Sequence, residues 1–208
     1  MPSIYYPYFE RTSSSNAHID TKWAFRGSDF DSSGSFSIEL SLKDVVQATS
    51  GQKCLWGIGS SSKHLELYLL NGNDIRLTLT DGSSTYSVAC TNVSLKSPTI
   101  IVTGSADNAY GFTVTVGSQT HTISNASLPV SANTLQIFAN YNKNSTGTGL
   151  EAKLCKCIIY GRKNSSSDRM MVYCGIPFGM QWGSSIEKTF FDFANNVAGD
   201  ITGSFSTP

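Results

Sequence analysis

Hydrophobic and polar residues alternate with a period of two over much of the chain. Residues 36–42, 64–69 and 75–80 each place an apolar side chain at every second position. This period is typical of β-strands with one face buried and one face in water. Glycine and asparagine interrupt the pattern, as in Asn71-Gly72-Asn73, and these residues favour the tight turns of antiparallel hairpins.

The same reasoning predicts strands in most of the remaining chain. About ten to fourteen short strands separated by turns predict an all-β fold, an antiparallel two-sheet β-sandwich of the jelly-roll kind. Two segments depart from the strand pattern: we expect helical character at residues 184–196 and a short turn at residues 43–48. The further strands are expected at residues 85–90, 99–103, 111–116, 119–123, 134–139 and 152–160.

The N-terminal segment has a different character. Pro2 and Pro7 interrupt it, so it cannot be a central strand. We expect residues 1–15 to form an arm and residues 16–208 to form the sandwich domain. Because exposed aromatic clusters usually mark contact surfaces, the arm either packs on a neighbouring subunit or covers an edge of its own sandwich. In the first case the partner-binding residues are Ile4, Tyr5, Tyr6, Tyr8 and Phe9.

The charge balance limits the classes of partner. The 208 residues include 15 Lys+Arg and 15 Asp+Glu, and 14% of them are charged, compared with roughly 25% in average domains. Nucleic acids and anionic membranes attract concentrated basic surfaces, so we expect neither as a partner. No window approaches the ~20 apolar residues of a membrane span, and we expect no secretory signal at the N-terminus.

The cysteines do not indicate a disulfide framework, because their number, five, is odd. They favour synthesis in a reducing cytosol. Cys155 and Cys157 alternate within an expected strand, so we expect both to pack in the core rather than to bind zinc, which requires four ligands. We expect no cofactor.

A weak calcium motif begins at Asp29 and Asp31, in the segment Asp-Phe-Asp-Ser-Ser-Gly. In a true calcium loop a bidentate Glu at position 12 closes the oxygen shell. Position 12 here is Leu40, and Glu39 lies one place early in an expected strand. A polar turn is therefore the better interpretation, with calcium as the weaker alternative.

The acidic residues do not form a catalytic pair. A glycoside hydrolase needs two carboxylates roughly 5–10 Å apart, whereas Glu39, Glu66 and Asp192 stand alone in the sequence. His64 alternates onto the same strand face as Glu66, which indicates a surface pair on the solvated face. No Gly-x-Ser-x-Gly nucleophile elbow occurs. The sequence predicts a protein without enzyme activity.

Three tryptophans are candidates for stacking on sugar rings. Trp56 lies in an apolar segment, so we expect it in the core. Trp182 lies between glycines in an expected loop, and Trp23 follows an expected strand. Trp182 and Trp23 are therefore the candidate glycan contacts, although either side chain can equally pack onto its own sandwich.

Several segments over residues 17–206 resemble the concanavalin A-like, laminin-G-type jelly rolls that recur in phage virion proteins and in gut bacterial surface proteins. The chain departs from the family pattern at residues 161–168 and 178–185. The segments that carry the resemblance are Ala17-His18-Ile19-Asp20-Thr21, Cys54-Leu55-Trp56-Gly57-Ile58-Gly59, and residues 154–160, 169–177 and 190–196.

The resemblance implies a virion structural protein, such as a head decoration protein, head fibre or tail fibre, made in the bacterial host cytoplasm. Its partners would be other virion proteins and further copies of itself, with a trimer as the common state of fibres, and a host-cell glycan. Since this fold carries many functions, two alternatives stay open: a carbohydrate-binding lectin module of a bacterial surface protein and, less favoured, a glycan hydrolase.

Overall fold

The computed structural model describes residues 3–25, 35–47, 49–105, 111–124, 133–162, 169–182 and 184–208. Sixteen strands and no helix occur in these ranges, so no helix there is long and apolar enough to cross a membrane. The strands are β1 (Ser3–Tyr5), β2 (Phe9–Arg11), β3 (His18–Ala24), β4 (Ser35–Gln47), β5 (Lys53–Gly59), β6 (Lys63–Leu70), β7 (Asp74–Asp81), β8 (Thr85–Cys90), β9 (Thr99–Ser105), β10 (Phe112–Val116), β11 (Gln119–Ile123), β12 (Thr134–Ile137), β13 (Leu150–Arg162), β14 (Arg169–Trp182), β15 (Ser185–Asp192) and β16 (Val197–Thr202).

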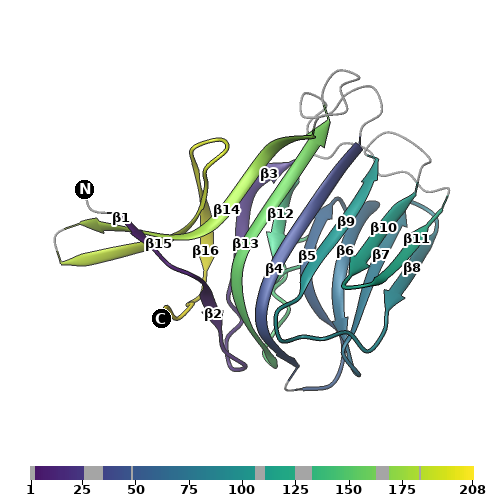
Figure 1. The fold of residues 1–208 in the computed structure, drawn as a ribbon, viewed down its shortest axis with the longest axis horizontal. Helices are drawn as coiled ribbons and strands as arrows, with labels where there is room; N and C mark the ends of the chain where they lie inside the picture. The colour runs from purple at the N-terminus through teal and green to yellow at the C-terminus, as the bar shows by residue number, and fades with distance from the viewer. Residues whose placement is uncertain are drawn as a thin grey trace.

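The strands follow one continuous antiparallel path, in the order β11-β10-β9-β4-β13-β14-β15-β16-β3-β12-β5-β6-β7-β8. In Figure 1 this path forms two facing layers, with β4, β9, β10, β11 and β13 in front of β5, β6, β7, β8 and β12. Strand β16 pairs with β15 in one layer and β3 in the other, and the end strands β8 and β11 contact each other. The all-β antiparallel prediction is confirmed, whereas the division into two separate sheets is not.

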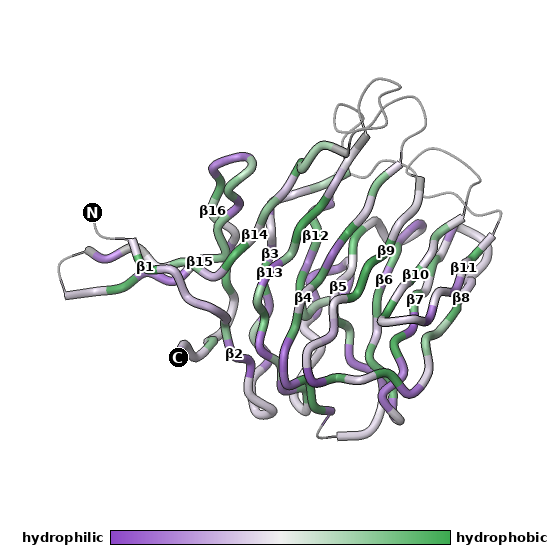
Figure 2. The backbone as a smooth tube through the Cα atoms, in the orientation of Figure 1, coloured by the Kyte–Doolittle hydropathy of each residue, from purple (hydrophilic) through white to green (hydrophobic). Residues whose placement is uncertain are grey.

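The core lies between the two layers. Leu65, Leu67 and Leu69 of β6 are fully buried, and Figure 2 shows hydrophobic positions alternating with hydrophilic ones along the strands. Trp56 is 1% exposed, which confirms its predicted place in the core. Each large apolar side chain buried in this way contributes about 1.5–3 kcal/mol to folding.

The turn between β6 and β7 depends on its residue types. Gly72 and Asn73 have φ values of +81° and +63°, a left-handed conformation that glycine and asparagine adopt most readily. The turn therefore reverses the chain and places Leu70 opposite Asp74.

The N-terminal segment adds strands to its own domain. Strand β1 pairs with β14 and β2 pairs with β13, and Figure 1 shows β1 projecting from the body together with the ends of β14 and β15. Phe9 is fully buried and its ring stacks on Phe205 with 5.8 Å between centroids. Residues 3–11 thus cover edges and ends of their own sheet, the second of the two alternatives that the sequence left open.

The expected helix at residues 184–196 is wrong. Strand β15 occupies residues 185–192, between β14 and β16, and turns follow it. Hydrogen bonds to two neighbouring strands outweigh the weak local preference of this segment, since strand propensity depends strongly on context.

The expected short turn at residues 43–48 is also wrong for the described residues 43–47, which continue β4. The register of β4 against β13 shifts in this part of the strand, since Val46 pairs with Glu151 but Lys43 pairs with Lys153, and Asp44 adopts a φ of +48°. A β-bulge explains why the local sequence has the character of a turn although the chain stays paired.

Candidate functional site

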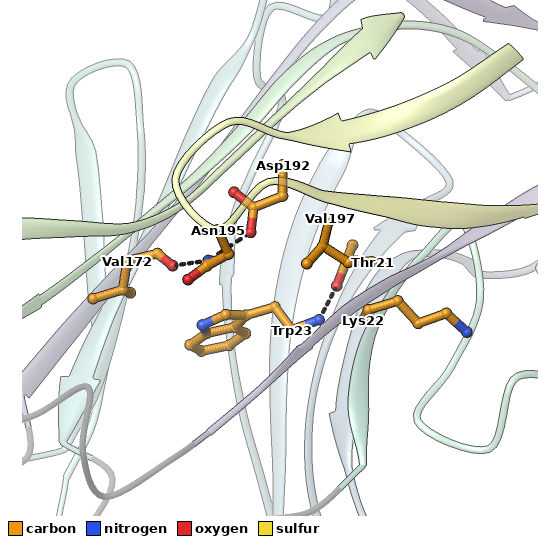
Figure 3. Close-up of a pocket in the computed structure, with 7 residues that line it drawn as sticks. All are labelled: Thr21, Lys22, Trp23, Val172, Asp192, Asn195 and Val197. Carbon is orange, nitrogen blue, oxygen red and sulfur yellow. Dashed lines mark hydrogen bonds between the residues drawn. The ribbon is translucent and has the colours of Figure 1, made fainter. Parts of the chain in front are cut away.

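A small pocket lies where the chain crosses from one layer to the other, and we call it the Trp23 pocket (Figure 3). Its volume is about 80 Å³. A cavity of roughly 150 Å³ holds one benzene molecule, so the Trp23 pocket, about half that size, suits a small substituent better than a six-membered ring. Its lining comes from β3, from β14 and from the turn between β15 and β16: Thr21, Lys22, Trp23, Val172, Asp192, Asn195 and Val197.

A β-bulge in β3 shapes one wall of this pocket. Ala24 pairs with Thr134 and Asp20 with Gln136, so β3 uses extra residues over this stretch. Lys22, within the bulge, has a φ of +64°, a conformation that costs a non-glycine residue about 1–3 kcal/mol and is common at functional sites. The Lys22 Nζ forms ion pairs with Asp20, at 3.5 Å, and with Asp200.

Trp23 forms another wall. The residue is 5% exposed, and its indole Nε1 is buried with no hydrogen-bond acceptor among the described residues. Figure 3 shows this nitrogen on the edge of the ring that faces Asn195 and Val172. A buried donor without an acceptor is costly, by roughly 1–3 kcal/mol, and in a native structure it calls for an explanation.

The third wall is a turn held by Asp192. Its Oδ1 accepts hydrogen bonds from the backbone N–H groups of Cys174 and Ala194, both at 2.9 Å. The Asn195 Nδ2 donates to Asp192 Oδ2 at 2.6 Å and to the carbonyl of Val172 at 2.7 Å. The Asp192 carboxylate, 3% exposed, is therefore committed to the geometry of the turn.

A much larger groove lies where the two end strands of the path, β8 and β11, meet, and we call it the Gln119 groove. Its volume is about 700 Å³, within the range of roughly 300–1,000 Å³ typical of ligand sites. Most of its side chains carry a hydroxyl or an amide, with apolar groups between them. The lining residues are Asn92, Val93, Ser94, Lys96, Ser97, Pro98, Thr99, Ile101, Thr115, Val116, Gly117, Ser118 and Gln119.

Hydrogen bonds fix the loop that forms one wall of this groove, residues 91–98. The Gln119 side chain accepts the N–H of Thr91 at 2.9 Å and donates to the carbonyl of Thr91 at 2.8 Å. On the other side, the N–H groups of Asp44 and Val45 donate to carbonyls of this loop at 2.9 and 3.0 Å. The groove is thus preformed, which reduces the entropy lost when a ligand binds.

Sequence reasoning missed the Gln119 groove. Its two parts, residues 92–101 and 115–119, meet because β9 pairs with β10 and because the end strands β8 and β11 lie next to each other. The available signal was the long polar connection Thr91-Asn92-Val93-Ser94-Leu95-Lys96-Ser97-Pro98 between two strands.

The His64–Glu66 pair is not on a solvated face, contrary to the prediction. Glu66 is 5% exposed and accepts hydrogen bonds from the Tyr68 hydroxyl at 2.5 Å and from the Tyr141 N–H at 3.4 Å. Tyr141 stacks on His64 with 4.0 Å between ring centroids. A loop that follows β12 covers both residues, because Gly57 beneath it has no side chain to keep it away.

Glu66 and Asp20 are buried acidic residues on strands of the same layer. Backbone pairing connects them across the sheet, because Asp20 pairs with Gln136, Gln136 with Gly57 and Gly57 with Glu66. Three strand spacings place their backbones roughly 14 Å apart. Each carboxylate has a partner of its own, since the Lys143 Nζ donates to Asp20 at 2.9 Å and the Tyr68 hydroxyl donates to Glu66.

The predicted partner-binding residues differ widely in exposure. Tyr5 is 64% exposed, Ile4, Tyr6 and Tyr8 are half-buried, and Phe9 is fully buried. Only the first four therefore present surface to a partner. Tyr5 stacks on Phe193, itself 42% exposed, with 5.9 Å between centroids.

The other candidate residues are placed as follows. Trp23 is buried at the pocket described above, the backbone of Trp182 pairs with Ser185 at the end of β14, and Asp29 and Asp31 lie outside the described residues. Within the described ranges no group of three or more His, Cys, Asp or Glu could hold a metal ion.

The two cysteines of the Cys-x-Cys segment differ in burial, whereas we expected both to lie in the core. Cys157 is fully buried, and burial raises the pKa of its thiol. Cys155 is half-buried, because a register shift between Leu154 and Lys156 breaks the alternation.

The chain matches no model of a known protein family and no curated protein sequence. Solved structures do match. The CBM40 carbohydrate-binding module of the Ruminococcus gnavus IT-sialidase aligns with a TM-score of 0.54 at 11% identity, covering 76% of this chain and 90% of that one. The same module bound to α2,3-sialyllactose gives 0.53, at the same identity and coverage.

Domains LG4–5 of the mouse laminin α1 chain align with a TM-score of 0.52 at 12% identity, covering 88% of this chain. The match covers 47% of that laminin chain, about half its length. At these identities the likeness shows the fold alone. The fold of this chain is thus similar to that of carbohydrate-binding module and laminin-G domains, as the sequence resemblance implied.

Proposed function

We propose that the chain is a glycan-binding module and that the Gln119 groove holds the sugar. The observation that carries this proposal is the chemistry of the groove, whose walls are rich in hydroxyl and amide side chains. Sugar hydroxyls both donate and accept hydrogen bonds, and so do these side chains. A volume of about 700 Å³ is large enough for an oligosaccharide.

The charges around the groove support binding rather than hydrolysis. Lys96 is the one charged residue among the lining residues that the structure describes, and that lining contains no carboxylate. A glycoside hydrolase requires two carboxylates beside the scissile bond. The groove therefore holds its ligand without acting on it.

The fold supports the same proposal. The CBM40 module is named for carbohydrate binding, and its structure in complex with α2,3-sialyllactose has the fold of this chain. A common fold does not transfer a function, so the proposal rests on the groove, and the likeness adds that such domains are used for glycan recognition.

A glycan array with the whole chain tests the proposal, followed by titration of the best ligand. Ser118 is exposed in the turn between β10 and β11 and lines the groove, so Ser118→Trp fills the groove and should weaken binding at least 10-fold. Ser83→Trp, in the exposed turn between β7 and β8, is the matched control and should bind as the wild type does. A blank array, or equal affinity of Ser118→Trp, refutes the proposal.

Assembly into a virion is a second candidate function. The protein–protein contact that assembly requires is favoured by the aromatic cluster of Tyr5, Phe178, Phe191 and Phe193, in which Tyr5 and Phe193 are 64% and 42% exposed. Exposed aromatic surface is typical of protein interfaces. A virion component should co-purify with phage particles at fixed stoichiometry, and its absence from purified particles refutes this role.

A further inference from the structure

We infer that the Trp23 pocket is a second ligand site, which takes the acetamido group of an N-acetylated sugar. The inference rests on the proposed function and adds a substrate class to it. The size of the pocket gives the first argument. A volume of about 80 Å³ equals the share of nearly three water molecules, which suits a group of three or four heavy atoms such as an acetamido group.

The polar atoms of the pocket give the second argument. The Trp23 Nε1–H is a donor without an acceptor, and the carbonyl oxygen of an acetamido group is a strong acceptor. The Asn195 side chain is exposed and lies on the same side of the ring (Figure 3). Access of a ligand oxygen to the buried indole N–H requires this side chain to rotate, which breaks its hydrogen bonds to Asp192 and to the carbonyl of Val172.

The apolar atoms of the pocket give the third argument. Val172 and Val197 line the pocket together with the indole ring, and Val197 is 39% exposed. An acetyl methyl group placed against these side chains leaves water for an apolar surface, which is favourable.

The charges in and around the pocket favour a neutral group. The Asp192 carboxylate is buried in the lining. The Lys22 ammonium, the one cation among the described lining residues, already pairs with Asp20 and Asp200, and in Figure 3 it extends away from Trp23. A carboxylate or sulfate of an acidic sugar would meet a net negative charge at this site, whereas an acetamido group is uncharged.

The test compares two trisaccharides that differ in the acetamido group. Chitotriose carries an acetamido group on each ring, and cellotriose has hydroxyls in those positions. We expect chitotriose to bind at least 10-fold more tightly in calorimetry, and saturation-transfer NMR should show the acetyl methyl protons in closest contact with the protein. Equal affinities, or saturation spread evenly over the sugar, would overturn the inference.

Variants separate this site from the groove. Trp23→Phe keeps an aromatic wall and removes the N–H, and should bind chitotriose about 10-fold more weakly. Val197→Phe fills the pocket from an exposed position and should abolish this binding, while Val46→Phe, at a 48% exposed position on β4, should not.

The groove variant distinguishes the two proposals. We expect Ser118→Trp to keep its affinity for chitotriose. If Ser118→Trp loses chitotriose and Val197→Phe keeps it, the sugar binds in the groove alone, and the inference about the Trp23 pocket is wrong while the proposed function stands. If no glycan binds to any form of the protein, both are wrong.

Discussion

The backbone nitrogen of Tyr141 lies directly over Gly57, where an added Cβ would come within 2.6 Å of it. Such a distance is far below van der Waals contact, and the other two nearest atoms, both of Asn140, are also backbone. The loop therefore has to move if Gly57 gains a side chain. This relationship explains how the loop reaches Glu66 and buries it.

Gly57→Ala is accordingly expected to lower the free energy of unfolding by about 1–3 kcal/mol, the usual effect of overpacking. Gly72→Ala, in open space at a φ of +81°, measures the backbone contribution alone and should lower it by about 1 kcal/mol. Urea unfolding followed by tryptophan fluorescence measures both values. A Gly57→Ala protein as stable as the wild type would contradict this account of the loop.

The surroundings of the Asp20 carboxylate lead us to expect that the free energy of unfolding depends on pH. Burial raises the pKa of Asp20, but hydrogen bonds from Lys143, Thr134 and the Lys22 N–H outweigh it and lower the pKa to about 2. Since this folded-state pKa lies below the unfolded value of about 3.9, the stabilisation is present above pH 4 and is lost as the pH falls toward 2.

The shift corresponds to about 2–3 kcal/mol. At pH 6 the free energy of unfolding of the wild type should therefore be higher than that of Asp20→Asn by about the energy of this shift. The difference should shrink steadily between pH 4 and pH 2. The matched variant Asp200→Asn, whose side chain is 69% exposed, should change stability by less than about 0.5 kcal/mol. A gap between wild type and Asp20→Asn that stays constant with pH would count against the network.

The N-terminal segment yields a paired prediction. Phe9 is fully buried, so Phe9→Ala should lower the free energy of unfolding by about 3–5 kcal/mol. Tyr5 is 64% exposed, and Tyr5→Ala should change it by less than about 0.5 kcal/mol. Thermal unfolding of the two variants measures this contrast, and equal effects would show that residues 3–11 do not pack as described.

Gln119 acts on the groove through Thr91, because two hydrogen bonds join its side chain to the backbone of that residue. Gln119→Ala removes both hydrogen bonds and releases one end of the loop formed by residues 91–98. We expect the dissociation constant of a groove-bound glycan to rise about 5–10-fold, while the melting temperature falls by only a few degrees. Ser84→Ala, in the turn between β7 and β8, should leave the affinity unchanged. If the Gln119→Ala protein binds the glycan as tightly as the wild type does, Gln119 does not contribute to the site.

The strands were predictable where alternation was local. Residues 64–69 and 75–80 lie within β6 and β7, because a period of two describes a strand with one buried face. Residues 184–196 could not be assigned in this way, since β15 depends on the strands on both of its sides. Local sequence contains no information on neighbours that lie far away in the chain.

The candidate sites were less predictable than the strands. The sequence singled out Trp23 as a candidate glycan contact, but its position did not indicate a buried N–H beside a pocket formed partly by residues 192–197. Alternation placed Glu66 on the outer face, and only the loop above Gly57 makes that position buried. Both features depend on contacts between distant segments, which the pattern of one strand does not contain.

Titration of the isotope-labelled protein with the best glycan from the array tests the central claim most directly, because amide NMR shifts locate the ligand on the fold. The account predicts that the largest shift changes cluster at residues 92–99 and 115–119, the walls of the Gln119 groove, and that Ser118→Trp abolishes them. Saturating glycan that leaves these amides unchanged would contradict it.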